Sequence, residues 1–521
     1  MARLGHMLGW KWTTIGAKLG RETLIAQATE FRASCLATAV ERPLDIVFLT
    51  MLGGNTYNVT LEAVLAIALR DRGHRVRLIL CDQALPLCEV KKAGREDDWK
   101  HACGKCYGFG KKYLASYGLE VMTVSDILTH IATATLTRDP NDWSDIVEAS
   151  LLKHYQVGIA PQTAEAASRR ELLNQSAAIS ARIGQALVSM APDRVIMSHG
   201  IYTTWGPQRD ILNRAGIPVI TYSKGTKRAS ERFNWKTSAA RWDLSEEWEK
   251  VKATPLTPEQ EERIDAYLMS RRSHSRDIVI YNAAREEDAQ VLRHRLALAA
   301  TKPTFVLFTN VLWDSASTRR EIVFKDSVQW VVQTIQWFAH HPEKQLVIRI
   351  HPAEAWKGTN QPYSAIIASH FPALPANVVV IEPTSQVNSW SLIHLADIGL
   401  VHTSTAGLEL PLEGVPCIVV SRIHYRGKGF TIDVGTQDEY FQILQEFDAR
   451  SIDRDRLVTL AKRYAYLVFE RYQLPFSLFH ELTFGDVRAL LASSVSDLLA
   501  DKGMALVVQA IEQRQSFLLP D

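Results

Sequence analysis

The sequence predicts an α/β protein with two doubly wound parallel sheets, one in each half of the chain. Apolar runs of strand length alternate with segments of helical periodicity in both halves, which is the pattern of βαβ units. A polar, charge-rich stretch from residue 224 to about residue 276 separates the two series. We therefore expect one domain over residues 1–276 and a second over residues 277–521. Ligands of such sheets bind beyond the carboxyl ends of the strands.

In the first half, five apolar runs predict strands and four periodic segments predict helices. The predicted strands cover residues 44–51, 74–80, 118–121, 194–197 and 218–222. The predicted helices cover residues 59–70, 143–154, 164–190 and 205–215. Gly53, Gly54 and Asn55 follow the first strand, where glycines let a backbone approach a ligand closely.

The second half repeats this alternation. Strands are predicted at residues 304–308, 346–350, 377–381, 398–401 and 416–420. Helices are predicted at residues 328–340, 389–396, 407–412 and 437–447, and the tail from residue 455 to residue 499 is predicted to be helical.

The composition is that of an ordinary globular protein. The chain has 521 residues, of which 46% are hydrophobic and 22% charged. A formal net charge of +2 creates no overall field that would attract nucleic acid. Lys11, Lys18 and Arg21 interrupt every apolar run that could serve as a secretory signal, and no run of about 18 apolar residues predicts a transmembrane helix. We expect a cytoplasmic protein.

The first forty residues form a basic segment that carries two tryptophans. Apolar residues from Leu4 to Leu19 are interleaved with Arg3, Lys11 and Lys18. Two interpretations remain open. Such a helix can lie in a membrane interface, which would place the protein at the inner face of the membrane, or it can pack on the outside of the first domain.

Four of the six cysteines fall in one short window. Cys81, Cys88, Cys103 and Cys106 have the spacing C-x6-C-x14-C-x2-C, which matches no standard zinc module. In a reducing compartment, clustered thiols favour a structural zinc or an iron–sulfur centre over disulfides. The alternatives are buried structural thiols or a redox pair.

Three consecutive hydroxyl residues follow the strand predicted at 398–401. They are Thr403, Ser404 and Thr405, and they open a predicted helix that contains Gly407 and Glu409. Backbone N–H groups at a helix start, hydroxyl donors and a glycine together suit a phosphate. Glu409 lies one turn deeper, where a carboxylate can accept hydrogen bonds from a ribose diol. An ordinary capped helix is the alternative.

A histidine ends the strand predicted at 346–350. His351 follows Arg349 and precedes Pro352, and it could donate a hydrogen bond to the same phosphates. An ordinary X-Pro turn is the alternative. Because both motifs follow strands of the same half, we expect one nucleotide-sugar site.

The second half resembles the capsule polysaccharide biosynthesis family of glycosyltransferases, which is similar to the bacterial 3-deoxy-manno-octulosonate transferases and polysialyltransferases. The resemblance covers residues 300 to 435. It is carried by four ordered segments, at residues 308–314, 349–354, 402–409 and 424–431. It implies the GT-B fold, in which two Rossmann-like domains face a cleft. The first domain, with its N-terminal helix, would take the acceptor, and the second would take the donor.

The resemblance also implies roles for particular residues. The histidine of the His-Pro pair and the hydroxyl cluster would hold the donor phosphate, and the glutamate after the cluster would bind ribose. Arg426 and Lys428 would neutralise leaving-group charge, unless they form only a solvated turn. The implied donor-binding set is Asn310, Arg349, His351, Thr403, Ser404, Thr405, Gly407, Glu409, Arg426 and Lys428.

The catalytic base is expected in the first domain. His199 ends a strand and has a suitable pKa for taking a proton from an acceptor hydroxyl. A hydrogen-bonded structural histidine is the alternative, and Asp82 and Glu62 are the next candidates for the base.

These features predict a glycosyltransferase that moves a sugar from a nucleotide-sugar donor to a surface or capsular glycan or glycolipid. The transfer would need no metal, because His351 and the Thr403 helix end would stabilise the phosphate. Two other functions remain open. They are a nucleotide-sugar 2-epimerase of the same fold and a non-catalytic module that binds a nucleotide or a partner.

Overall fold

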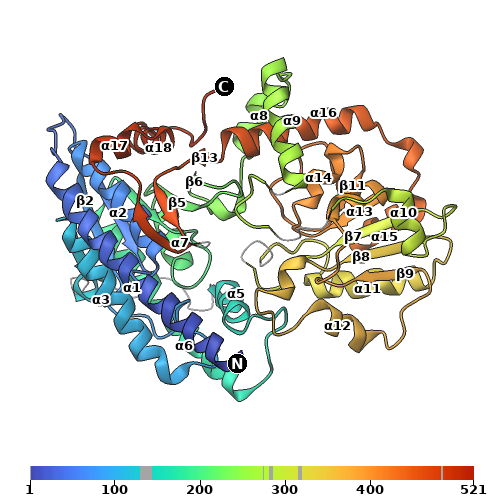
Figure 1. Ribbon diagram of the computed structural model, residues 1–521, viewed down its shortest axis with the longest axis horizontal. Helices are drawn as coiled ribbons and strands as arrows, with labels where there is room; N and C mark the ends of the chain where they lie inside the picture. Colours follow the sequence, from blue (N-terminus) through green and yellow to red (C-terminus); the bar gives the residue numbers. More distant parts are fainter. Residues whose placement is uncertain (1, 130–142, 274, 281–284, 315–318, 483–484) are drawn as a thin grey trace. The chain divides into compact units, whose positions relative to one another are not determined.

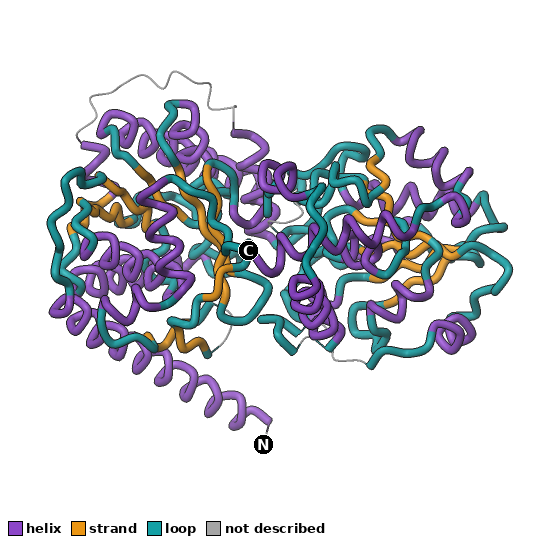
Figure 2. The backbone as a smooth tube through the Cα atoms, turned by 90° about the horizontal axis from the view of Figure 1, so that it is seen from above, coloured by secondary structure: helices purple, strands orange, loops and turns teal. Residues whose placement is uncertain are grey.

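The computed structural model describes residues 2–129, 143–273, 275–280, 285–314, 319–482 and 485–521. The chain divides into two compact units. The first contains residues 1–154, 162–240 and 473–521, and the second contains residues 155–161 and 241–472. Each unit is an open, mainly parallel sheet with helices on its faces (Figures 1 and 2).

The first unit contains a seven-stranded sheet of order β13-β6-β5-β4-β1-β2-β3. Strands β1 to β5 are parallel, whereas β6 and β13 are antiparallel to their neighbours. The strands are β1 (Asp45–Thr50), β2 (Arg75–Leu80), β3 (Glu120–Thr123), β4 (Arg194–Met197), β5 (Val219–Lys224), β6 (Ser230–Trp235) and β13 (Leu474–Pro475).

Helices cover both faces of this sheet because alternate residues of β1 enter two separate cores. Ile46 and Phe48 pack with α1, α2 and α18, whereas Val47 and Leu49 pack with α6 and α7. The helices are α1 (Ala2–Ser34), α2 (Thr56–Asp71), α3 (Trp99–Ser116), α4 (Val124–Thr129), α5 (Ser144–Tyr155), α6 (Ala164–Met190), α7 (Gly206–Arg214), α17 (Val495–Ala500) and α18 (Lys502–Gln513).

The second unit contains a six-stranded parallel sheet of order β12-β11-β10-β7-β8-β9. The first strand in the chain, β7, is central in this sheet. The chain adds β8 and β9 on one side of β7 and then adds β10, β11 and β12 on the other side. The strands are β7 (Thr304–Phe308), β8 (Gln345–Arg349), β9 (Val378–Ile381), β10 (Ile398–Val401), β11 (Cys417–Val419) and β12 (Ile432–Asp433). This order places the topological switch point, where such sheets bind ligands, between β7 and β10.

Helices also surround the second sheet. They are α8 (Ser245–Val251), α9 (Pro258–Arg272), α10 (Ala289–Arg295), α11 (Ser327–Ala339), α12 (Tyr363–His370), α13 (Ser389–Leu395), α14 (Ala406–Leu412), α15 (Gln437–Glu446) and α16 (Arg454–Ala465). A π-helix at Tyr466–Arg471 follows α16 directly. The α/β class with doubly wound parallel sheets, the architecture of GT-B proteins, is confirmed.

The unit boundary differs from the predicted boundary at residue 276. Residues 241–276 belong to the second unit, where Tyr267 packs on Phe469 and Arg271 pairs with Glu409. The C-terminal residues from 473 return to the first unit, because Leu474 pairs with Glu231 of β6 and α18 enters its core.

The prediction of a helical tail over residues 455–499 is wrong for the second part of that range. There β13, β14 (Phe479–Glu481) and β15 (Val487–Leu490) replace the expected helix. In the described part of the chain, no helix combines the length and the apolarity that a membrane crossing requires.

Candidate functional site

The loops that leave β7, β8 and β10 are joined by hydrogen bonds at the switch point of the second sheet. The backbone N–H of His351 donates to Thr309 Oγ1 at 3.0 Å. The backbone N–H of Thr403 donates to Asn310 Oδ1 at 3.1 Å, and this bond is buried. The structure therefore brings together Asn310, His351 and Thr403, as predicted from their positions after neighbouring strands.

His351 is held in one tautomer. It caps the 3-10 helix Pro352–Ala355, and its Nδ1 accepts a hydrogen bond from Ala353 N at 3.1 Å. Burial, and to a smaller extent the charge of Lys357, lowers the pKa of His351 to about 4. A neutral ring whose Nδ1 accepts carries its proton on Nε2. His351 is thus a neutral hydrogen-bond donor at physiological pH.

The turn formed by Thr403, Ser404 and Thr405, called the hydroxyl turn below, does not open a long capped helix. Helix α14 has seven residues and contains Pro411, so its dipole is short. Ser404 Oγ accepts from Ala406 N at 3.3 Å, and Ser404 O accepts from the Tyr425 hydroxyl at 2.6 Å. Thr405 makes no side-chain cap.

Gly407 is required by packing. A Cβ at this position would lie 2.3 Å from Tyr425 Oη, a distance that no real contact shows. The glycine thus makes room for the tyrosine that supports the Ser404 turn, and the close approach expected of a ligand is instead made by a side chain of the protein.

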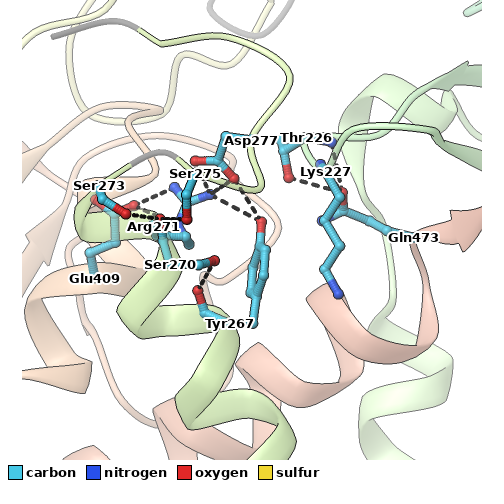
Figure 3. A network of polar contacts seen from close by, with 10 residues as sticks. All are labelled: Thr226, Lys227, Tyr267, Ser270, Arg271, Ser273, Ser275, Asp277, Glu409 and Gln473. Atoms are coloured by element: carbon cyan, nitrogen blue, oxygen red, sulfur yellow. Dashed lines mark hydrogen bonds and ion pairs between the residues drawn. The ribbon is translucent and has the colours of Figure 1, made fainter. Parts of the chain in front are cut away.

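Glu409 lies in a buried ion network (Figure 3). Its Oε1 accepts from both Nε and Nη2 of Arg271, a residue of α9. Arg271 Nη1 reaches Asp277, whose Oδ1 also accepts from the Tyr267 hydroxyl at 3.0 Å. The carboxylate predicted to bind ribose therefore has a structural partner, and among the described residues its Oε2 accepts no hydrogen bond.

The two cations of the 424–431 segment are engaged within the protein. Arg426 donates to the carbonyls of Val419 at 2.9 Å and Val434 at 2.7 Å, so it ties β11 to the loop before α15. Lys428 Nζ donates to Ser245 Oγ at 2.9 Å, and burial lowers its pKa. For Arg426 these contacts favour a structural role over the predicted neutralisation of leaving-group charge.

Arg349 at the end of β8 is buried and has spare hydrogen-bonding capacity. Its Nη1 donates to Glu382 O at 2.6 Å, whereas Nε and Nη2 are buried without a partner. Burial lowers its pKa to about 10, so it remains a cation at neutral pH. This cation lies two residues before His351, which is where the donor-binding prediction placed it.

The glycine-rich turn of the first unit packs on a helix. Cβ atoms at Gly53 and Gly54 would lie 2.7 Å from Leu80 and from Cys106, respectively. Asn55 caps α2 by accepting from Asn58 N at 3.0 Å. Local packing thus accounts for all three residues that were expected on the acceptor side of the site.

His199 is oriented unfavourably for a base. Its Nδ1 accepts from Ile201 N at 3.2 Å, and its ring packs edge-on against Tyr202 and Trp205. A neutral ring in this arrangement carries its proton on Nε2, where it donates instead of accepting. Catalysis by His199 as a base would require this hydrogen bond to break.

The two alternative bases lie in different surroundings. Asp82 Oδ1 accepts from Ser125 N at 3.3 Å in an exposed bond. Glu62 is almost fully buried, accepts from the Tyr222 hydroxyl at 2.6 Å, and has its pKa raised to about 8 by burial. Glu62 is therefore largely protonated at neutral pH and shielded from an acceptor.

The four clustered cysteines are free thiols. Cys103 and Cys106 lie on α3, and the Cys106 thiol lies 3.1 Å from Gly54 N. Burial raises the pKa of each of the four thiols. Among the residues that the structure describes, no three His, Cys, Asp or Glu side chains are grouped to hold a metal ion, so the metal-centre prediction gains no support from this geometry.

Two arginines were missed by sequence reasoning. Arg271 pairs with Glu409 across 138 positions, and Arg320 lies buried beside the end of β11. The sequence does contain a pattern that could have predicted the position of Arg271. A capping box at Thr257 starts a helix, and Ile264, Tyr267 and Arg271 fall on its buried face.

Comparison with known proteins identifies the second unit. A family model described as capsule polysaccharide biosynthesis protein matches residues 256–472. No curated protein sequence matches the chain significantly.

Solved structures are similar at low identity. A beta Kdo 2,4 transferase, KpsC of Thermosulfurimonas dismutans, is 17% identical, with a TM-score of 0.34, over 53% of this chain and 79% of that chain. The calicheamicin glycosyltransferase CalG4 is 15% identical, with a TM-score of 0.25, over 81% of this chain and 94% of that chain. A UDP-GlcNAc 2-epimerase of Neisseria meningitidis is 12% identical, with a TM-score of 0.23, over 80% of this chain and 97% of that chain.

The segment matched by the family model contains all four motifs and the joined loops of β7, β8 and β10. Residues 256–472 therefore carry the domain of the capsule polysaccharide biosynthesis family, which confirms the resemblance predicted from the motifs.

Proposed function

We propose that the protein is a glycosyltransferase that moves a sugar from a nucleotide-sugar donor to a capsular or surface glycan. One observation carries the proposal. The hydrogen bonds Thr309–His351 and Asn310–Thr403 hold His351 and the hydroxyl turn at the switch point of the second sheet.

The chemistry of this site suits an anionic leaving group. His351 Nε2–H would donate to a phosphate oxygen, the hydroxyls of residues 403–405 would add further donors, and Arg349 would supply positive charge nearby. Preorganised donors of this kind stabilise charge that develops as the sugar leaves, without reorganising water. We propose that this donor set serves the transfer step in place of a metal ion.

The substrate classes follow from the site and from the family. The second unit would hold the nucleotide, with Glu409 Oε2 accepting from the ribose. The first unit would receive a glycan or glycolipid acceptor. Peripheral contact with the inner face of the membrane through α1 remains part of this proposal.

The first prediction tests the donor site. We expect His351→Ala to weaken nucleotide binding by about 1.5–3 kcal/mol, roughly 10- to 150-fold, because a hydrogen bond to a charged phosphate is lost. Calorimetric titration with CMP, UDP and GDP would measure this loss. Glu409→Ala is the less clean variant, because the same carboxylate holds Arg271.

The chain provides a matched control for this prediction. His341 also precedes a proline, but its Nδ1 lies 2.7 Å from Trp337 O and its ring stacks on Trp337. His341→Ala should leave nucleotide affinity unchanged. If the wild-type protein binds none of the nucleotides, or if both histidine variants bind equally well, the donor-site assignment is wrong. A transferase should also release free nucleotide in the presence of acceptor, without forming an epimerised sugar nucleotide.

A further inference from the structure

Arg320 is a buried arginine at the carboxyl edge of the second sheet. Its segment runs beside the end of β11, where Glu321 forms an isolated bridge with Ser421 and Arg422 N donates to Arg320 O at 2.7 Å. Its Nη1 donates to Arg422 O at 3.1 Å, but its Nε is buried with no partner. Only 6% of the residue is exposed.

Among the residues that the structure describes, Arg320 forms no ion pair. Asp243, Glu321 and Tyr425 are the acidic groups whose fields raise its pKa, yet within the described ranges no carboxylate forms an ion pair with it. Burial is the larger effect and lowers its pKa to about 10, so the group still carries its charge at neutral pH. A buried cation without a counter-ion costs folding free energy, which an anionic ligand would offset.

His402, at the start of the candidate site, feels the electrostatic field of Arg320. His402 directly precedes Thr403, is buried, and has an unpartnered Nδ1. Burial, together with the field of Arg320, lowers the pKa of His402 to about 3. The carbonyl of His402 accepts from Ser421 Oγ, which ties the start of the hydroxyl turn to the segment that carries Arg320.

Arg426 provides the contrast. Both of its Nη atoms donate to backbone carbonyls, one in β11 and one before α15, so its guanidinium stabilises the local fold. Within the described part of the chain, the Arg320 side chain makes one hydrogen bond, to the carbonyl of Arg422, with which residue 320 pairs. This bond does not explain why a charge is buried there.

We propose that Arg320 binds a phosphate group of the donor from the β11 side of the Thr403–Thr405 turn, while His351 approaches from the β8 side. The inference rests on the proposed function. The segment that carries Arg320 pairs with residues 420–422, just beyond the end of β11. In that stretch Ser421 Oγ donates to His402 O at the start of the turn, while His351 follows β8, on the other side of β7 from β10.

The test compares Arg320→Met with Arg320→Lys and a control. Arg422→Met is the control, because Arg422 is exposed and its contacts with residue 320 use its backbone. Calorimetry and thermal unfolding would be run with CMP, UDP and GDP, and with cytidine, uridine and guanosine, which lack the phosphate.

We expect Arg320→Met to lower nucleotide affinity by about tenfold or more, the scale of one charged hydrogen bond, and to leave nucleoside affinity unchanged. Arg320→Lys should fall between Arg320→Met and the wild type. Without ligand, the melting temperature of Arg320→Met should equal or exceed that of the wild type, because an uncompensated charge is removed. A structural arginine would show the opposite change.

The outcomes separate the two proposals. If the wild type binds no nucleotide, the donor site and this role of Arg320 both fall. If the wild type binds and Arg320→Met binds equally well, only the role of Arg320 falls. The same conclusion follows if Arg320→Met lowers the melting temperature of the free protein while nucleotide affinity is unchanged.

Discussion

Arg271→Met is expected to destabilise the second unit by about 3–5 kcal/mol, the usual cost of breaking a buried ion pair from one side. The substitution leaves Glu409 and Asp277 without their cation, and the side chains of both are nearly buried. It also removes one of the ion pairs between α9 and α14. Methionine keeps most of the side-chain volume against Phe469, so the loss reports on charge more than on packing. Urea unfolding, followed by tryptophan fluorescence, would measure the effect.

The neighbouring arginine is a matched control. Arg272 also joins α9 to α14, through Glu413, but its side chain is 29% exposed. Arg272→Met should cost no more than about 1 kcal/mol, because partly exposed pairs contribute little. Equal unfolding midpoints for the two variants would show that burial does not set the strength of this network. An Arg271→Met protein as stable as the wild type would show that the network is dispensable.

The strands of both sheets were largely predictable from the sequence because parallel strands are buried on both faces. Runs such as Thr304–Phe308 and Ile398–Val401 are largely apolar and carry no charged residue, and the structure places strands at these residues. The positions of His351 and Thr403 followed from this, since each residue comes just after a strand and the carboxyl ends of parallel strands share one edge.

The elements that were missed are polar or depend on partners far along the chain. Strand β6 and helix α9 lie in the charge-rich stretch 224–276, for which no strand or helix was predicted and near whose end the domain connection was placed. Strand β13 pairs with β6 across more than 200 residues, so its local sequence does not reveal its state. Both examples show tertiary context overriding local propensity.

Residue roles were harder to predict than residue positions. Glycine at positions 53, 54 and 407 suggested close approach of a ligand, and the structure shows helix, cysteine and tyrosine atoms in that space. The sequence shows that Arg426 is a cation, but not that two carbonyls already accept its hydrogen bonds. Spacing identifies candidate residues, whereas the assignment of a function depends on which of their atoms already have partners.

Glu62→Gln is expected to stabilise the first unit, most strongly at alkaline pH. Glu62 has a folded-state pKa of about 8, raised by burial from the ordinary glutamate value of 4.5. The unfolded chain therefore releases this proton at lower pH than the folded chain, and wild-type stability is lost as pH rises from about 4.5 to about 8. Glutamine is neutral throughout, and its side-chain oxygen can still accept from the Tyr222 hydroxyl.

The advantage of Glu62→Gln should thus be small near pH 5 and reach about 2–4 kcal/mol at pH 8, since one pKa unit corresponds to about 1.4 kcal/mol. Urea unfolding at several pH values would measure it, with Glu120→Gln as a control for removing an exposed carboxylate from the same unit. A pH-independent difference would show that Glu62 titrates alike in both states. A Glu62→Gln protein that is both destabilised and inactive would show that the carboxylate makes an interaction near β5 that glutamine cannot replace. Glu62 would then again be a candidate for the catalytic base.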